Sequence, residues 1–276
     1  MNAIEIKNLT KTYPGFRLDN LSLTLPSGCI LGLIGENGAG KSTTIKLLLG
    51  MLRPDSGESS LLGQAIANME DIGVVLDESG FPDCLNAGQI GTIMSEIYQR
   101  WDGEKYTALL DRFSLPLKKK YREFSRGMKM KLAIAVAMSH EPKLLILDEA
   151  TSGLDPVIRD DVLDLFMEFT RDSGHSILIS SHIVSDLEKL CDYIAFLHKG
   201  KLTLLEEKDA LYERFGMVLC SKEEFDSIPT HAVKGKKENR YGIEAIVDRS
   251  FIPQGLTVTP VSIEDLFIFM AKEDKV

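Results

Sequence analysis

The chain has 276 residues, of which 44% are hydrophobic and 26% are charged, and its formal net charge is −9 at pH 7. This composition is typical of a globular protein with room for one large domain and one small one. The acidic balance disfavours nucleic acid and anionic lipid as main binding partners. We therefore expect no direct contact with nucleic acid.

The four cysteines are far apart and form no CxxC pair, which favours reduced, mostly buried thiols in a cytoplasmic protein. Residues 1–5 do not resemble a signal peptide. No apolar run approaches the roughly 18 residues of a membrane-spanning helix. Any association with a membrane is therefore expected to come through a partner.

Hydrophobic periodicity predicts, in chain order, two alternating strands and then strands that alternate with helices. The predicted strands of this part are 4–7, 21–25, 29–34, 72–76, 143–147, 177–180 and 194–197. The predicted helices are 43–49, 157–170 and 184–190, with a longer helical stretch from about 86 to 141. Because such alternation builds parallel sheets, we expect an α/β fold with a mixed or largely parallel core sheet.

The predicted organisation has two parts. Residues 1–206 form the α/β domain, with an N-terminal antiparallel β part and an inserted helical subdomain at about 80–142. After residue 206, short predicted strands at 217–219, 243–247 and 256–258 lie among charged loops, and a helix closes the chain. Residues 207–276 are therefore expected to form a small α+β appendage.

One loop carries the clearest chemical signal, because residues 35–42 read GENGAGKS and fit G-x-x-x-x-G-K-[ST]. It lies between a predicted strand and a predicted helix, where glycines let backbone N–H groups and the helix dipole face a phosphate. Lys41 can reach the β- and γ-phosphates, and Ser42 can place its hydroxyl on Mg²⁺. The residues predicted to bind the nucleotide here are Gly35, Glu36, Asn37, Gly38, Ala39, Gly40, Lys41, Ser42 and Thr43.

A second signal is an apolar strand that ends in two carboxylates, at residues 144–149. The carboxyl end of a parallel strand beside a phosphate loop places such charges at the metal. Asp148 is predicted to hold Mg²⁺, directly or through water. Glu149 is predicted to polarise the water that attacks the γ-phosphate.

Three further segments follow the same order as in a known family: 124–128 (FSRGM), 152–155 (SGLD) and Ser181-His182. With the two motifs above, they make the chain resemble the nucleotide-binding subunit of ABC transporters over roughly residues 1–206. The resemblance implies a P-loop NTPase fold of the ABC ATPase type, with ATP and Mg²⁺ bound. It identifies 35–42 as Walker A, 144–149 as Walker B with its adjoining glutamate, and 152–155 as the D-loop.

The resemblance also implies roles for single residues. Ser125 and Gly127 match the signature loop, which faces the ATP of a second subunit, whereas Arg126 departs from the usual glycine and is a candidate phosphate contact. His182 resembles the switch histidine that reads the γ-phosphate. Tyr13 lies where the family places an aromatic ring that stacks on adenine. Two subunits would thus sandwich two ATP molecules.

Asp77 is the clearest departure, because the family usually has glutamine there, touching Mg²⁺ and linking to the transmembrane partner. Its carboxylate is predicted either to join Ser42 and Asp148 at the metal or to serve only the contact with that partner.

The predicted function is the ATP-hydrolysing subunit of an ABC exporter, peripheral on the inner face of the cell membrane. Residues 260–268 resemble the closing segment of exporter subunits whose permease is a separate chain. The implied partners are that permease and a second ATPase subunit, either a copy of this chain or a different one. The alternative is a soluble ABC-type ATPase that acts on ribosomes or DNA, which the single cassette, the negative charge and the lack of a heptad array disfavour.

Overall fold

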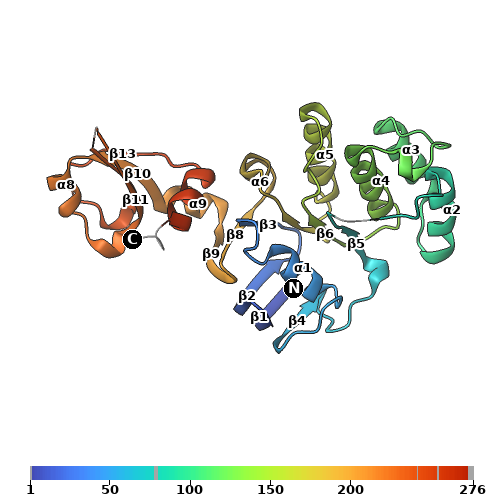
Figure 1. The fold of residues 1–276 in the computed structure, drawn as a ribbon, viewed down its shortest axis with the longest axis horizontal. Coiled ribbons are helices and arrows are strands. Elements are labelled where there is room, and N and C mark those ends of the chain that lie inside the picture. The colour runs from blue at the N-terminus through green and yellow to red at the C-terminus, as the bar shows by residue number, and fades with distance from the viewer. Residues whose placement is uncertain (1, 78–79, 241, 254, 273–276) are drawn as a thin grey trace.

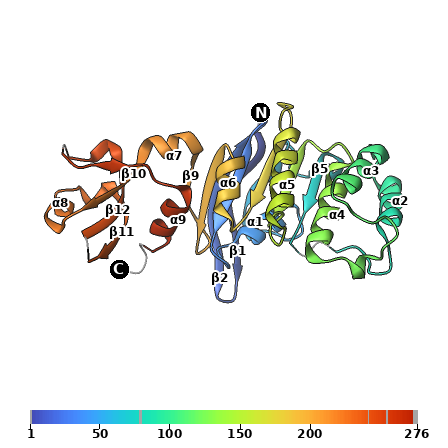
Figure 2. The same cartoon turned by 90° about the horizontal axis from the view of Figure 1, so that it is seen from above.

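The computed structural model describes residues 2–77, 80–240, 242–253 and 255–272. A central α/β part lies between helices α2–α4 (residues 87–138) at one end of the molecule and a C-terminal region at the other (Figures 1 and 2). The fold is the predicted α/β fold with a mixed core sheet and further antiparallel sheets.

Six strands form the central sheet, in the order β5-β6-β7-β3-β8-β9. Their bounds are β3 (Ile30–Gly35), β5 (Ile72–Val75), β6 (Leu144–Asp148), β7 (Ser176–Ser180), β8 (Tyr193–His198) and β9 (Lys201–Glu207). All neighbours pair in parallel except β8 and β9, which are antiparallel. Since β6, β7 and β3 are adjacent, their carboxyl ends meet at one edge, and the predicted phosphate loop and acidic pair lie there.

The central strands are apolar on both faces because each face covers a separate core. In β3, Ile30 and Ile34 belong to a core shared with the helices that follow β5, β6 and β7, whereas Leu31 and Leu33 belong to a core shared with the N-terminal sheet and the helix that follows β3. Helices α5 and α6 lie on one side of the sheet, and α1 (Lys41–Leu48) lies on the other (Figure 1). This two-sided burial fixes the sheet edge that carries the site.

The N-terminal sheet is antiparallel, as predicted, and has the order β2-β1-β4. Its strands are β1 (Asn2–Tyr13), β2 (Phe16–Pro26) and β4 (Ser56–Leu61). The predicted strands 4–7 and 21–25 are the inner parts of the longer β1 and β2. Strand β4 has a mostly polar sequence without apolar alternation, and it was therefore not predicted.

The helical stretch after β5 consists of α2 (Ala87–Ile97), α3 (Gly103–Arg112) and α4 (Arg126–Met138). Helix α2 begins with a capping box, in which Asn86 Oδ1 accepts from the Gln89 N–H at 2.9 Å and Gln89 Oε1 accepts from the Asn86 N–H at 3.1 Å. Helices α5 (Pro156–Phe169) and α6 (Val184–Leu190) follow β6 and β7. Each therefore starts close to the functional edge of the sheet.

The C-terminal region has its own antiparallel sheet, in the order β11-β12-β10-β13. Its elements are α7 (Lys208–Arg214), β10 (Phe215–Cys220), α8 (Lys222–Asp226), β11 (Val233–Asn239), β12 (Gly242–Asp248), β13 (Val258–Thr259) and α9 (Ile263–Lys272). Helix α9 also reaches the central part, where the Ile263 N–H donates to Glu188 Oε1 at 2.6 Å and the Phe267 and Phe196 rings lie 5.6 Å apart.

Two predictions from composition can be compared with this fold. All four cysteines are free thiols, but only Cys191 and Cys220 are buried, while Cys29 is half-buried and Cys84 is exposed. Among the residues described, no helix combines the length and the apolar character needed to cross a bilayer.

Candidate nucleotide site

The phosphate loop joins β3 to α1 and is held by its own backbone. Gly40 precedes the helix with φ of 113°, a left-handed conformation that glycine adopts without strain. A side chain there would also meet the Phe16 ring, because an added Cβ would lie 3.0 Å from its Cζ. The Lys41 side chain is 7% exposed, and its Nζ donates to the Gly35 carbonyl at 2.7 Å. The ammonium group is therefore held over the loop.

A cavity of about 500 Å³ opens over this loop and is called here the phosphate-loop cavity. It is lined by residues 36–43 together with Gly15, Phe16, Asp77 and Glu149. Eight of the nine predicted loop residues thus share one cavity wall, and the ninth, Gly35, lines the adjoining cavity described below. Within this lining, the Lys41 ammonium and the backbone N–H groups of the loop suit an anion such as a nucleotide phosphate.

Asp148 ends β6 and is fixed by a residue that the sequence did not single out. The residue is 3% exposed, and its Oδ1 accepts a hydrogen bond of 2.5 Å from the Ser180 hydroxyl at the end of β7. Ser180 also contacts the next residue, since the Glu149 N–H lies 3.1 Å from its carbonyl oxygen and 3.3 Å from Oγ. The only sequence signal for this role is the position of Ser180 at a strand end, two residues before His182.

Glu149 lies at the centre of the site. Its φ of 56° is left-handed, a conformation that is uncommon for a residue with a Cβ and that the surrounding bonds must hold. Its side chain is 15% exposed, with Oε2 at 2.6 Å from His182 Nδ1 and Oε1 at 3.9 Å from Lys41 Nζ. The predicted base, switch histidine and phosphate-binding lysine are thus brought together.

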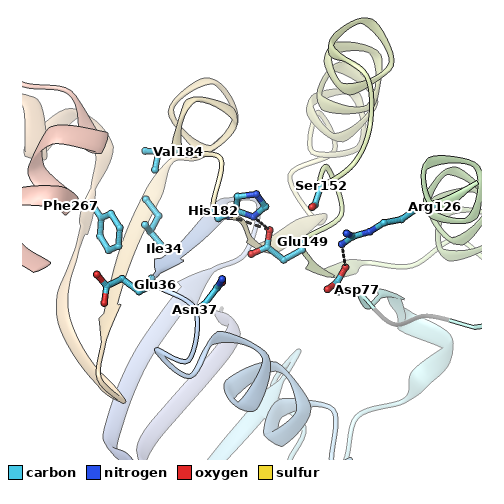
Figure 3. Close-up of a pocket in the computed structure, with 11 residues that line it drawn as sticks. Ile34, Glu36, Asn37, Asp77, Arg126, Glu149, Ser152, His182, Val184 and Phe267 are labelled. Carbon is cyan, nitrogen blue, oxygen red and sulfur yellow. Dashed lines mark hydrogen bonds and ion pairs between the residues drawn. The ribbon is translucent and has the colours of Figure 1, made fainter.

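A second cavity, of about 760 Å³, adjoins the first and is called the switch cavity (Figure 3). Its lining comprises residues 34–37, Asp77, Arg126, Glu149, Ser152, His182, Val184 and Phe267. The two cavities share Glu36, Asn37, Asp77 and Glu149, so Glu149 faces both. Phe267 comes from the C-terminal helix α9, and nothing in the sequence placed it here.

The signature-like loop begins helix α4. Ser125 is the N-cap, and its Oγ accepts from the Met128 N–H at 3.3 Å. Gly127 packs against the Gly153 carbonyl, 3.3 Å from the position of an added Cβ. Neither Ser125 nor Gly127 lines the two described cavities, whereas Arg126 lines the switch cavity and donates from Nη2 to Asp77 Oδ1 at 2.6 Å.

A smaller cavity of about 280 Å³, the metal-side cavity, gathers the three residues predicted to bind Mg²⁺. Ser42, Asp77 and Asp148 line it together with Lys46, Met51 and Leu76. Hydroxyl and carboxylate oxygens suit Mg²⁺, which takes one or two carboxylates along with substrate phosphates. In the interactions above, the Ser180 hydroxyl bonds Oδ1 of Asp148, which leaves Oδ2 for the ion. The hydroxyl and carboxylate oxygens of this cavity therefore fit Mg²⁺.

Tyr13 and Phe16 face each other across the turn of the β1–β2 hairpin. Tyr13 is 36% exposed, and Lys11 Nζ lies 5.8 Å from its ring centroid. The phosphate-loop cavity is lined by Phe16 and not by Tyr13. Phe16 is thus an aromatic residue of the site that the sequence reasoning missed, and the adenine-stacking role of Tyr13 stays a prediction.

Comparison with known proteins places this site in context. The family model of the ABC transporter matches residues 18–152. The chain is 35% identical over 217 residues to the ABC transporter ATP-binding protein YtrB of Bacillus subtilis, covering 77% of this chain and 74% of YtrB. It is 31% identical over 294 residues to the bacitracin transport ATP-binding protein BcrA of Bacillus licheniformis, covering 96% of each chain.

A solved structure has a similar fold. It is an ATP-binding cassette in a dimeric, post-hydrolysis state with ADP and phosphate bound, with a TM-score of 0.67, 22% identity, and coverage of 74% of this chain and 98% of that one. The match to BcrA includes the C-terminal region, whereas the match to this cassette covers about the length of the α/β part.

Proposed function

The chain belongs to the family of ABC transporter ATP-binding proteins, and on that premise we propose that two copies close around two ATP molecules to drive a separate membrane-spanning partner. As a member of this family, the chain binds and hydrolyses ATP. The observation that carries the proposal is the convergence of Lys41, Glu149 and His182 on adjoining cavities at one sheet edge.

ATP binding is assigned to the phosphate loop. Lys41 is proposed to turn its ammonium from the Gly35 carbonyl to the β- and γ-phosphates, a short movement because the loop already holds it over the cavity. Ser42, Asp148 and Asp77 are proposed to hold Mg²⁺, which neutralises phosphate charge when bound. Ser180 keeps the Asp148 carboxylate oriented toward that position.

Glu149 is proposed to be the general base that polarises water in line with the γ-phosphate. A contact of 2.6 Å between Nδ1 of His182 and an ionised carboxylate requires Nδ1 to be the donor. In the neutral ring, Nε2 is then an acceptor and cannot donate to a phosphate. His182 is therefore proposed to leave Glu149 when it binds the γ-phosphate, which frees the carboxylate for water.

The second subunit is proposed to present Ser125 and Gly127, since helix α4 begins there with free N–H groups. The similar cassette was solved as a dimer, which supports this arrangement. BcrA is named for bacitracin transport, and we propose by this relationship that the partner permease is an exporter and that the chain lies at the inner face of the membrane through it.

The alternative of an ATPase that acts on ribosomes or DNA gains no support from these comparisons, because the relatives reported are transport subunits.

Two measurements on the purified chain test the dimer. The ATPase rate per chain should rise with protein concentration, because each site needs loop residues from another copy. Glu149→Gln should also accumulate as an ATP-bound dimer in sedimentation velocity. A rate per chain that stays constant over a wide dilution series, with the variant monomeric in saturating ATP and Mg²⁺, would refute the proposal.

A further inference from the structure

An ion pair within the chain joins two positions at which the sequence departs from the family's usual residues. Asp77 follows β5, and Arg126 begins α4, 49 positions away in the sequence. Arg126 Nη2 lies 2.6 Å from Asp77 Oδ1. The two unusual residues, one acidic and one basic, therefore contact each other directly. Neither residue by itself predicts this contact.

The arginine is held in this position by its stem as well as by its charge. Gly153 has φ of 76°, and an added Cβ there would lie 3.5 Å from Arg126 Cδ, so the arginine stem runs over the Gly153 turn. In Figure 3 the side chain extends from α4 toward Asp77, on the same side of the switch cavity as Ser152. The guanidinium thus connects the signature-like loop, the Gly153 turn and Asp77 in one subunit.

This arrangement conflicts with the role of the same loop in a dimer. The inference rests on the proposed function, in which residues 125–127 face the ATP of the second copy. A guanidinium beside Ser125 would there meet a triphosphate, for which arginine forms short charge-assisted bonds. Asp77 lines the cavities of its own subunit, so it draws the guanidinium toward its own chain.

We propose that the Asp77–Arg126 pair is an intrachain latch that opens when two subunits close, Arg126 exchanging Asp77 for the phosphates of the ATP bound to the second copy. The latch opposes association of nucleotide-free subunits, because no anion replaces Asp77. With ATP present, the triphosphate replaces Asp77 as the ion-pair partner of Arg126, and Asp77 is released beside Ser42 and Asp148. Asp77 is thus a positioning residue for Arg126.

The expected size of the effect follows from the exposure of the pair. The side chains of Arg126 and Asp77 are 62% and 41% exposed, so one latch should change an equilibrium only about 1.5- to 5-fold. A symmetric dimer opens two latches. Removing them should therefore tighten ATP-dependent dimerisation by about 2- to 25-fold.

The test uses the full chain with Glu149→Gln, saturating ATP and Mg²⁺, and measures the dimer dissociation constant by sedimentation velocity. Asp77→Asn keeps the shape and removes the charge. With Mg²⁺ saturating, so that loss of the proposed metal contact does not limit ATP binding, it should tighten the dimer within the range above. Arg126→Gln should weaken the dimer, and adding Asp77→Asn to it should cause no further tightening. Asp161→Asn is the control, because Asp161 pairs with Arg112 at 2.7 Å, is 34% exposed against 41% for Asp77, and lies away from the described cavities. It should leave the dimer unchanged.

A second measurement on the nucleotide-free monomer separates the latch from the dimer. Urea unfolding of the parent, the two single variants and the double variant should show a favourable coupling between Asp77 and Arg126. Equal tightening by Asp77→Asn with and without Arg126 would overturn the latch, since loss of negative charge near ATP would then suffice. No tightening, or no coupling in the monomer, would also overturn it. If no variant dimerises, the proposed dimer itself fails and the exchange fails with it, whatever the monomer cycle shows.

Discussion

Replacement of Glu149 by glutamine isolates the base from every other feature of the site. Glutamine keeps the Cβ at the left-handed backbone position, and its amide oxygen can still accept from His182, which lies 2.6 Å from Oε2. The other end faces Lys41 Nζ at 3.9 Å, too far for a hydrogen bond that the variant could lose. Only the charge and the basicity disappear. General-base catalysis contributes about 10²- to 10⁴-fold, so hydrolysis should slow by that factor, or about 3–5 kcal/mol in activation free energy.

The assay is single-turnover hydrolysis, with the chain in excess over labelled ATP and with Mg²⁺ present, alongside an equilibrium titration of nucleotide binding. Glu141→Gln is a matched control, because Glu141 also has a left-handed φ, of 55°, but is exposed and lines none of the three described cavities. The control should hydrolyse ATP at the parent rate. A Glu149→Gln rate within about threefold of the parent, far from the loss expected of a base, would show that Glu149 is not the base.

Three further outcomes are expected. Lys41→Ala should raise the ATP dissociation constant about 10- to 100-fold by losing a charged hydrogen-bond donor, whereas the surface variant Lys7→Ala should leave the titration unchanged. Ser180→Ala should destabilise the fold by about 1–3 kcal/mol and raise the Mg²⁺ concentration for half-maximal hydrolysis, because it removes the hydrogen bond to Asp148. Its control is Ser176→Ala, at the buried other end of β7, which should lower the stability without changing the Mg²⁺ dependence of hydrolysis. Burial opposes the charge of Asp248, but bonds from Arg214 and the Ser250 N–H outweigh it and hold its pKa below the usual range. Because the folded pKa of Asp248 is depressed, this stabilisation is present above the unfolded pKa of about 3.9 and is lost as the pH falls through the folded pKa. Between pH 5 and pH 3, the free energy of unfolding in urea should therefore fall less in Asp248→Asn than in the parent.

The sequence predicted the parts of the fold that depend on local pattern. The strand–loop–helix around Lys41 and the apolar strand before Asp148 have strong periodic signals, and both occur with small shifts in their bounds. Strands β4 and β9 were not predicted, because each is an edge strand of its sheet and lacks a continuous apolar run. The existence of β4 depends on pairing with the distant strand β1, about which local pattern carries no information, whereas β9 forms a hairpin with the preceding strand β8.

The same division applies to the site. Lys41, Asp148 and Glu149 belong to motifs whose residue types and spacing indicate phosphate binding, metal binding and base catalysis, so their roles could be predicted from the sequence. Ser180, Phe16 and Phe267 could not, because their places at the cavities arise only when the sheet order and the path of α9 bring separate segments together. The contact between Asp77 and Arg126 is of the same kind, since two unusual residues 49 positions apart give no signal of being neighbours.

The path of α9 has a practical consequence for any shortened version of the chain. A cut after residue 206, where composition changes, would remove the ring of Phe267 from beside Phe196, and with it part of the wall near Ile34 and Val184. Water would then reach apolar surface on the side of the cavity opposite Asp77. A truncated protein would report on a reshaped site, so loss of activity after truncation would be no measure of what the C-terminal sheet does in the intact transporter subunit.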